Sequence, residues 1–274
     1  MRRIVFVMCC VLASSACFAW GGRGHAAVGA LAQANLSPAA QAQVQTLLRD
    51  DLDRYEQASG RRSLASVASW ADEIREVASR TDPKAYRGWH GRSNRVCADT
   101  LGKCREGLCV DQLIISNARI LKDVQQPMRA RNEALKWIVH LVGDLHMPLH
   151  SGINSNGGGA KVFLEGVEIK GDATLHGVWD SELANAALKG WKSSAVLGAV
   201  SLLADDAPTQ WMLETRDVAL HEVYEPLSGF ACKEKLAEPI VLDSAYQLRS
   251  VPVVRQQIER AGLRLAQLLN QLLP

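Results

Sequence analysis

The chain has 274 residues, of which 47% are hydrophobic and 22% are charged. This length is ample for one hydrophobic core and does not require a second domain. With 31 Lys and Arg against 29 Asp and Glu, the net charge is too small to draw the whole molecule toward a polyanion. Any recognition of phosphate must therefore come from local charge, and a bound metal is one source of it.

The first 19 residues have the pattern of a secretory signal peptide. Two arginines precede an apolar run from Ile4 to Ala16, and Cys17-Phe18-Ala19 places small residues at the −3 and −1 positions of a cleavage site. The alternative, a lipoprotein, is disfavoured because Ser14 stands where a lipobox prefers Leu. We therefore expect residues 1–19 to be removed, the mature chain to begin at Trp20, and the protein to be secreted or periplasmic.

The expected mature chain, residues 20–274, forms one domain without net charge. The removed segment contains two arginines and no acid, so 29 basic residues remain against 29 acidic ones. No later stretch is long and uncharged enough to cross a bilayer. We expect neither a membrane partner nor an obligate protein partner.

Helical spacing of apolar residues dominates the chain. Ser37-Pro38 predicts an N-cap followed by Pro at the first helical position, before Val44, Leu47 and Leu48 on one face. Further helices are predicted over 64–77, over 135–142 with an end before Pro148, from near Leu175, from near Pro208, and over 253–272.

The only strand-like signal covers residues 161–170, where a central Gly166 predicts a small β-hairpin. Residues 91–111 are polar and irregular, and the glycine-rich stretch 154–160 is typical of a loop. No internal repeat or low-complexity linker interrupts the pattern. The predicted fold is therefore all-α, a single compact multi-helix domain with a small β-hairpin.

Four cysteines remain after the expected cleavage: Cys97, Cys104, Cys109 and Cys232. An even number in an exported protein indicates two disulfides, for which three pairings exist. Because Cys104 and Cys109 enclose a short Arg-Glu-Gly-Leu turn, we favour Cys104–Cys109 together with Cys97–Cys232. The alternative, a cysteine-rich metal site, lacks any CxxC spacing.

Two His/Asp pairs have the spacing of one helical turn. His140 and Asp144 lie on one predicted helix, His150 follows it, and His176 and Asp180 repeat the pairing on the next. A lone pair of this kind is usually a hydrogen bond or a weak ion pair. Two pairs and a third histidine in apolar surroundings favour a metal, and zinc accepts both imidazole and carboxylate ligands.

Three further motifs accompany these pairs: Trp20-Gly-Gly-Arg-Gly-His25, Trp70-Ala-Asp72 with Arg75, and Trp89-His90. The order of the motifs resembles the zinc-dependent single-strand-specific nucleases and 3′-nucleotidases of the S-one/P-one type, which share a helical fold with zinc-dependent phospholipase C. The resemblance covers nearly all of residues 20–274, and the four cysteines stand where this family has its two bridges. It implies cleavage of single-stranded DNA and RNA to 5′-phosphorylated products, and hydrolysis of 3′-mononucleotides.

The resemblance implies three Zn²⁺ ions and a full ligand set. The implied ligands are Trp20 (through its α-amine and carbonyl) and His25 for the first ion, Asp72, His90 and His140 for the second, Asp144 as a bridge between these two, and His150, His176 and Asp180 for the third. An uncut or tagged N-terminus should therefore lose one metal and most activity. His146 and His221 match no ligand position, so we interpret them as structural.

The resemblance also implies how the centre works. Asp72, Asp144 and Arg75 are the candidate catalytic residues, with water activated at the bridged metal pair attacking phosphorus in line. Arg75 lies one turn after Asp72 and could reach either that carboxylate or a phosphate oxygen. The alternative for Arg75 is a helix-surface arginine without a role in the reaction.

The sequence departs from the family where a base would be recognised. The residue after the zinc-binding His90 is commonly an aromatic that stacks on a base, but here it is Gly91. Ser93, followed by Asn94, replaces a frequent acid or amide, and the glycine loop reads Ser-Asn-Gly-Gly-Gly over 155–159. We therefore predict retained metal ligands with an altered base-recognition surface.

Two other functions compete with a nuclease. A phospholipase C-type hydrolase using the same metals would need an apolar surface to approach lipid, but aromatics are only 5% of the chain. A non-catalytic zinc scaffold would have closed coordination, whereas the implied third ion has three protein ligands and open positions.

Overall fold

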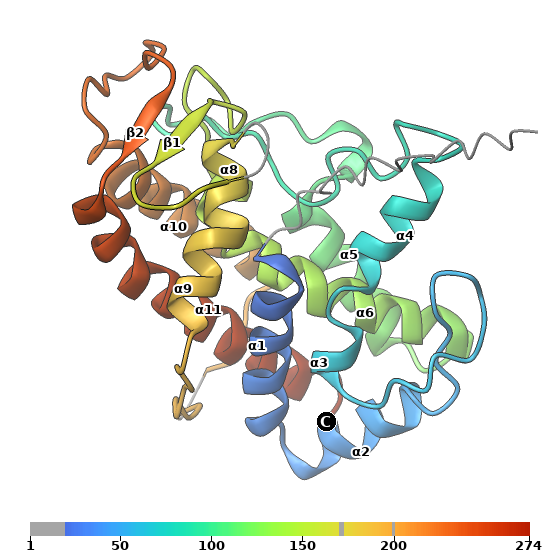
Figure 1. The fold of residues 1–274 in the computed structure, drawn as a ribbon. Coiled ribbons are helices and arrows are strands. Elements are labelled where there is room, and N and C mark those ends of the chain that lie inside the picture. The colour runs from blue at the N-terminus through green and yellow to red at the C-terminus, as the bar shows by residue number, and fades with distance from the viewer. Residues whose placement is uncertain (1–19, 170–172, 199–200) are drawn as a thin grey trace, which may run out of the picture.

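The computed structural model describes residues 20–169, 173–198 and 201–274 (Figure 1). The predicted signal peptide lies outside these residues, as does Lys170 at the end of the predicted hairpin. Most of the described chain is helical, with one small sheet, which confirms the predicted all-α class. No helix among the described residues is both long and apolar enough to traverse a bilayer.

The α-helices are α1 (Gly21–Ala34), α2 (Pro38–Leu47), α3 (Leu64–Val67), α4 (Trp70–Ala78), α5 (Val110–Lys122), α6 (Met128–Leu145), α7 (Pro148–Ser151), α8 (Leu175–Val178), α9 (Ala184–Leu188), α10 (Ala207–Val218) and α11 (Ser244–Leu272). The 3₁₀ turn η1 covers Arg105–Gly107, and two π-helical segments, η2 (Trp179–Leu183) and η3 (Ala219–Tyr224), continue α8 and α10. The strands are β1 (Val162–Leu164) and β2 (Ile240–Leu242).

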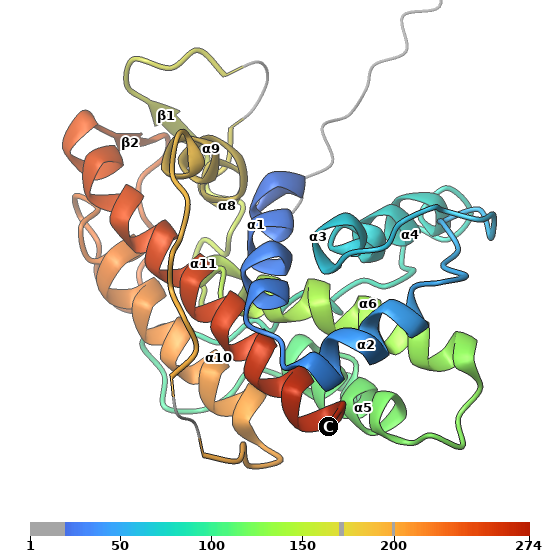
Figure 2. The same cartoon turned by 90° about the horizontal axis from the view of Figure 1, so that it is seen from below.

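Helix α6 occupies the centre of the molecule. Every residue from Ala134 to Leu145 is buried, so this half of the helix is surrounded on all sides by protein. It contacts α1, α2, α3, α4, α5, α10 and α11, and Figures 1 and 2 show these helices arranged around it. Polar groups on the buried half of α6 therefore have no access to bulk water and need partners inside the protein.

Several predicted helices are confirmed, with differences at their ends. Ser37 caps α2 by accepting a hydrogen bond from the Ala40 amide. The C-terminal helix begins earlier than predicted, at Ser244 after the Asp243 cap, and includes Pro252 in its interior. Sequence periodicity missed α1 and α5 altogether.

The helix predicted over 64–77 is two helices, because the chain breaks at Ala68 and Ser69 between α3 and α4. A helix break leaves carbonyl groups without intrahelical partners. The Ala68 carbonyl points to the buried face of α6, where it accepts a hydrogen bond from His140. The break therefore supplies a polar contact inside the core.

The predicted β-hairpin is wrong. Residues 162–164 do form a strand, but β1 pairs in parallel with the distant β2, in the register Val162↔Ile240 to Leu164↔Leu242. Both strands alternate buried and exposed residues, which is the pattern of a strand with one face on the core. Local alternation identifies a strand but does not identify its partner.

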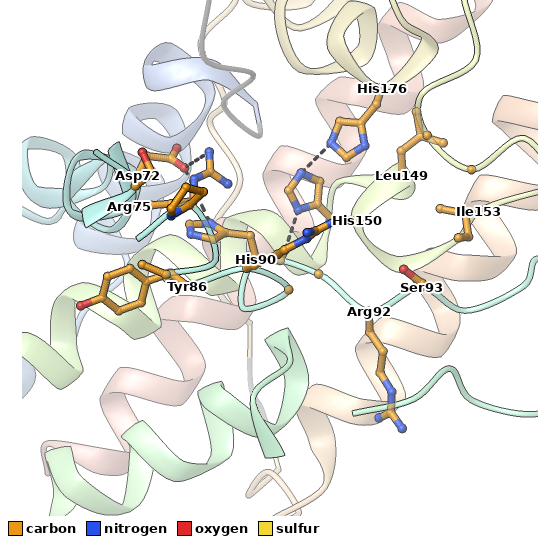
Figure 3. A pocket seen from close by; sticks show the side chains of 18 of the residues that line it. Asp72, Arg75, Tyr86, His90, Arg92, Ser93, Leu149, His150, Ile153 and His176 are labelled. Carbon is orange, nitrogen blue, oxygen red and sulfur yellow. Dashed lines mark hydrogen bonds and ion pairs between the residues drawn. The ribbon is translucent and has the colours of Figure 1, made fainter. Parts of the chain in front are cut away.

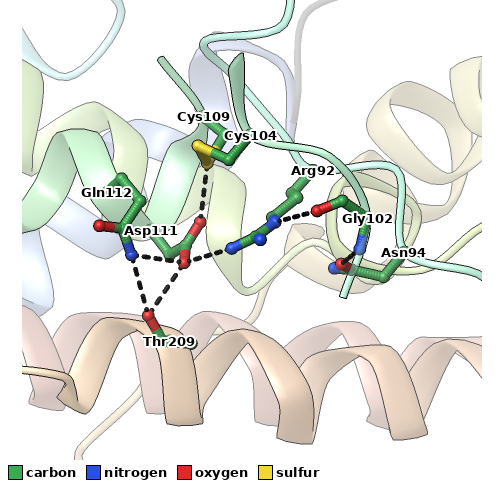
Figure 4. Close-up of a disulfide and its surroundings, with 8 residues drawn as sticks. All are labelled: Arg92, Asn94, Gly102, Cys104, Cys109, Asp111, Gln112 and Thr209. Atoms are coloured by element: carbon green, nitrogen blue, oxygen red, sulfur yellow. Dashed lines mark hydrogen bonds and ion pairs between the residues drawn. A yellow bond between two sulfur atoms is a disulfide. The ribbon is translucent and has the colours of Figure 1, made fainter. Parts of the chain in front are cut away.

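Both predicted disulfides are present. Cys97 and Cys232 join segments 135 residues apart with a Cα–Cα distance of 5.7 Å, and Cys104 pairs with Cys109 across η1 at 5.4 Å. The first bridge ties the irregular stretch after His90 to the segment that precedes β2. The second closes the turn immediately before α5 (Figure 4).

Candidate metal centre

His140 and Asp144 face inward together from α6. The Nδ1 atom of His140 donates to the Ala68 carbonyl at 2.7 Å, which leaves Nε2 directed at Asp144 Oδ2, 3.1 Å away. Such a hydrogen bond on the far nitrogen fixes the tautomer and ring orientation that a metal ligand needs. Both side chains are completely buried.

His25 joins them from α1. Its Nε2 lies 3.2 Å from Asp144 Oδ1, and its ring stacks on that of His140 with centroids 4.0 Å apart. The fit depends on Gly143, because a Cβ at that position would lie 2.7 Å from His25 Nδ1. The two oxygens of Asp144 thus face different histidines.

The second oxygen of Asp144 belongs to a group that includes Asp72 of α4 and His90. His90 Nδ1 lies 2.9 Å from Asp144 Oδ2 and 3.0 Å from His140 Nε2. Asp72 lies 3.7 Å from both histidines, Oδ1 facing His90 Nδ1 and Oδ2 facing His140 Nε2. Four side chains from three parts of the chain therefore point their donor atoms at one small volume.

A third group lies nearer the surface. His150 Nε2 is 2.9 Å from His176 Nε2 (Figure 3). Asp180 approaches them with Oδ2 at 3.1 Å from His176 and Oδ1 at 4.0 Å from His150. His176 lies on α8 and Asp180 on η2, a π-helical segment of the kind often found at functional sites. His150 is fixed by donation from Nδ1 to the His90 carbonyl at 2.5 Å.

The three groups have the composition and spacing of metal sites. Within each, one donor atom per residue lies within 4.8 Å of the others: His25, His140 and Asp144; Asp72, His90 and His140; His150, His176 and Asp180. Tetrahedral zinc with bonds of about 2.0–2.1 Å separates its ligand atoms by about 3.3 Å. The separations of 2.9–4.0 Å found here bracket that value.

Burial supplies a second reason for a cation. The carboxylates of Asp72, Asp144 and Asp180 are at most 2% exposed, and burying such charge is costly without a compensating partner. Within the described part of the chain, neither nitrogen of His25 has a hydrogen-bond partner, and Asp144 Oδ1 accepts none. A metal ion would satisfy these atoms, so the residues present fit one.

The pKa values of the histidines follow from this setting. Burial lowers the pKa of His150 to about 4 and also lowers that of His90, so both imidazoles are neutral and ready to bind a metal. Burial acts in the same direction on His140, but the nearby Asp144 and Asp72 carboxylates outweigh it and raise its pKa to about 9. These carboxylates therefore favour the protonated form of the His140 imidazole.

Trp20 lies directly beside the inner groups. Its indole is 1% exposed and donates from Nε1 to the Gly143 carbonyl at 2.9 Å. Its own carbonyl accepts from the Gly24 amide at 3.0 Å, at the start of α1. The residue predicted to begin the mature chain is therefore anchored one position away from Asp144.

Arg75 contacts Asp72, the first of its two predicted partners. One guanidinium nitrogen lies 2.9 Å from Asp72 Oδ1, and the Arg75 side chain is 29% exposed. It also lines the cleft above the metal groups, so the same side chain reaches both a buried ligand and the substrate side. Figure 3 shows Arg75 beside Asp72, on the opposite side of His90 from His150 and His176.

A cleft of about 1180 Å³ opens over these groups. Asp72, His90, His150 and His176 line it, whereas His25, His140, Asp144 and Asp180 do not. The departures noted in the sequence also border it: Gly91, Ser93, Gly157 and Gly158. These positions and the side chains of His150 and His176 therefore border the same cleft.

Gly91 cannot carry a side chain in this backbone. A Cβ there would lie 2.8 Å from the His150 carbonyl, closer than real contacts. Asn94, adjacent to Ser93, is buried and structural, since it donates to the Ser151 carbonyl at 2.7 Å and accepts from the Gly102 amide at 2.8 Å. Neither residue offers a stacking or hydrogen-bonding group to a base.

The contacts that hold the segment after Gly91 in place were not predicted from the sequence. Arg92 donates to Asp111 at 2.9 Å and to the Gly102 carbonyl at 2.8 Å, and Asp111 also accepts from Thr209 at 2.9 Å (Figure 4). The fully buried Asp111 lies in the first turn of α5. A single acid at a helix start is a weak signal, so only the fold identifies this contact.

The two histidines set aside as structural lie outside all three groups. His146 is buried, donates to the Val142 carbonyl at 2.8 Å and accepts from Arg264 at 3.1 Å. Burial, reinforced by Arg264, lowers its pKa to about 3. His221 is exposed and lies 2.9 Å from Glu225, one turn away.

The arrangement can be compared with known proteins. The family model for S1/P1 nucleases matches residues 20–274. The chain belongs to the S1/P1 nuclease family. Membership in this family identifies it as a hydrolase acting on phosphodiester bonds of nucleic acid.

Similar proteins span almost the same length. Endonuclease 2 of Arabidopsis thaliana is 27% identical over 274 residues, covering 92% of this chain and 90% of the relative. Nuclease S1 of Aspergillus oryzae is 27% identical over 271 residues, covering 91% and 90%. Nuclease P1 of Penicillium citrinum is 29% identical over 166 residues, covering 59% and 57%.

Proposed function

We propose that this S1/P1-family protein is an exported, zinc-dependent endonuclease that cleaves single-stranded DNA and RNA to 5′-phosphorylated products and also hydrolyses 3′-mononucleotides. The observation that carries the proposal is that the two oxygens of Asp144 face different histidines, Oδ1 facing His25 and Oδ2 facing His90 and His140, with His150 and His176 of a third group lining the cleft beside them. A centre with several adjacent cations suits in-line displacement at phosphorus, because the entering and leaving oxygens both need charge stabilisation.

Three zinc ions are proposed to occupy the groups, with Trp20 and His25 holding one, Asp72, His90 and His140 a second, His150, His176 and Asp180 a third, and Asp144 bridging the first two. When bound, zinc lowers the pKa of water toward neutrality and neutralises phosphate charge. The protein supplies the rest: Ala68 and His90 carbonyls orient the imidazoles, and burial keeps competing water away from the inner ligands.

Arg75 is proposed to position Asp72 and to meet a phosphate oxygen in the cleft. Its guanidinium is a fork of N–H donors whose geometry suits a phosphate oxygen as well as the carboxylate of Asp72. Its partial exposure on the cleft wall suits contact with a substrate that arrives from solvent.

Removal of residues 1–19 is proposed to complete the inner centre, because it converts the Trp20 amide into a free α-amine. The buried indole, anchored on Gly143, would hold that amine close to the inner ligands. Two disulfides agree with an oxidising, extracytoplasmic location.

The proposal is tested on protein that begins at Trp20. Metal analysis should give three zinc ions per chain, and a chelator should abolish cleavage of single-stranded DNA until zinc is restored. Duplex DNA should be cut far more slowly, and 3′-AMP should release phosphate while 5′-AMP does not. Hydrolysis of phosphatidylcholine but of no nucleic acid would replace this function with a phospholipase C activity.

A matched pair of proteins tests the role of the terminal amine. One begins at Trp20 and the other carries a single additional Ala before it. The extended protein should bind one zinc ion fewer and lose about 100-fold in activity, because the amine becomes an amide that cannot bind metal. Equal zinc content in the two proteins would remove Trp20 from the ligand set.

A further inference from the structure

A second cavity adjoins the catalytic cleft. It has a volume of about 350 Å³ and is lined by Arg95, Val96, Cys97, Ala98, Ile153, Asn154, Ser155, Phe230 and Lys233. Ile153 borders both this cavity and the cleft over the metal groups. Because Ile153 is three residues after His150, it lies at most about 10 Å along the chain from the outer metal group.

The cavity has two walls that are held together covalently. One wall is the segment 95–98, which pairs with residues 153–154 through the bridge between Arg95 and Ile153. The other wall is the segment 230–233. The Cys97–Cys232 disulfide joins the two, so the separation of the walls is fixed before any ligand arrives.

The charge of the cavity is positive. Arg95 and Lys233 line it, no acidic side chain does, and neither cation forms an ion pair with an acid within the described residues. Arg95 is positioned by donation to the Asn154 carbonyl. Asp99 and Glu234 follow in the sequence but do not line the cavity. The chain as a whole has a net charge of only +2, so this cavity provides a local attraction for a phosphate group.

An aromatic ring completes the lining. Phe230 is half-buried, and its ring stacks on that of the buried Tyr224, with centroids 5.8 Å apart and an interplanar angle of 25°. A ring supported from behind in this way keeps its other surface available for a planar ligand. Aromatic rings bind unpaired bases by stacking with little regard to their identity.

We propose that this cavity is a nucleotide subsite, in which Phe230 stacks on a base and Arg95 and Lys233 contact a phosphate of the nucleotide adjacent to the one at the metal centre. The proposal rests on the nuclease function proposed above. It also accounts for how a cleft that lacks a stacking residue at position 91 can retain affinity for a strand. The subsite would increase affinity for polynucleotides and leave mononucleotides unaffected.

The test compares two substrates on the same variants. Arg95→Gln/Lys233→Gln and Phe230→Leu are assayed on a (dT)₈ oligonucleotide and on 3′-AMP, with Lys122→Gln as the control. Lys122 is exposed at the end of α5 and lines neither cavity. Thermal unfolding and zinc content establish that each variant is folded and loaded.

The double variant and Phe230→Leu should each raise KM for (dT)₈ about tenfold and leave kcat/KM for 3′-AMP unchanged. In the double variant, the slope of log KM against log salt should also fall by about 0.7, because loss of one phosphate contact removes about 0.7 of a released counterion. Lys122→Gln should match the wild type on both substrates.

Three results would overturn the proposal in distinguishable ways. Unchanged KM for (dT)₈ in both variants, with an active wild type, would exclude the subsite and leave the nuclease function in place. Parallel losses on (dT)₈ and 3′-AMP would show damage to the metal centre instead of a separate subsite. A zinc-loaded wild type that cleaves neither substrate would remove the nuclease function and the subsite with it.

Discussion

The inner and outer metal groups are built from the same residue types but differ in their access to solvent. In the inner groups, the side chains of His25, His140 and Asp144 are completely buried, and His90 is 6% exposed. In the outer group, His176 is 27% exposed and lies on the cleft. A buried group can hold a permanent charge, whereas a group open to the cleft can exchange water for substrate.

The inner and outer groups also differ in the length of the elements that carry them. The inner groups are carried mainly by α1, α4 and α6, and α1 and α4 each pack on α6. The outer group depends on short elements, namely α7, α8 and the π-helical η2. The comparison predicts that inner ligands determine whether a centre forms and outer ligands determine how well it acts on substrate.

Asp144→Asn should have the largest effect, because one oxygen of Asp144 faces each inner group. We expect loss of both inner metal ions and a fall in kcat/KM of at least about 1000-fold on single-stranded DNA. Metal analysis and steady-state kinetics measure the two effects. The control is Asp205→Asn, an exposed acid outside the metal groups. Retention of three ions in Asp144→Asn would refute the bridging role.

Asp180→Asn should affect the outer group and leave the inner groups intact. Loss of this outer carboxylate should remove one ion, leave two, and lower kcat/KM about 100-fold. The inner ions should remain because their ligands lie on other elements. Metal content before and after dialysis distinguishes the groups. Loss of all three ions together would mean that the groups form one cooperative unit, contrary to the comparison.

Arg75→Gln should have the smallest effect, since Arg75 touches a ligand of the inner region but is itself partly exposed. We expect full metal content and a loss of about fivefold in kcat/KM, because an accessible ion pair contributes little to stability. Arg75→Lys should recover part of the loss, since it keeps the charge. Loss of zinc from Arg75→Gln would contradict this expectation and show that metal binding at Asp72 requires Arg75.

The sequence predicted which side chains come together better than it predicted the architecture that carries them. His140/Asp144 and His176/Asp180 were recognisable because helical spacing places each pair on one face, and α6 and the α8–η2 segment confirm the proximity. Their convergence with His25 and Asp72 could not be derived from spacing, because it depends on how α1 and α4 pack on α6. That part came from resemblance to a family.

Three other features could not be predicted from the sequence, each for a physical reason. The parallel pairing of β1 with β2 joins residues far apart in the chain, and alternation reveals only a strand's buried face. Helix α1 was missed because Gly and Ala fill much of it, which weakens its apolar periodicity. The cavity at Arg95 and Phe230 depends on a disulfide between distant segments, so no local pattern indicates it.

The close approach of Gly91 to His150 has a consequence for how such an enzyme can diversify. The two segments are joined in both directions, because the Arg92 amide donates to the His150 carbonyl at 2.9 Å and the His150 side chain donates from Nδ1 to the His90 carbonyl. Any side chain added at 91 would collide with the His150 carbonyl. An ancestor or descendant with an aromatic at this position must therefore have shifted the loop first, so new base preferences should arise more readily at the far wall of the cleft than beside the metals.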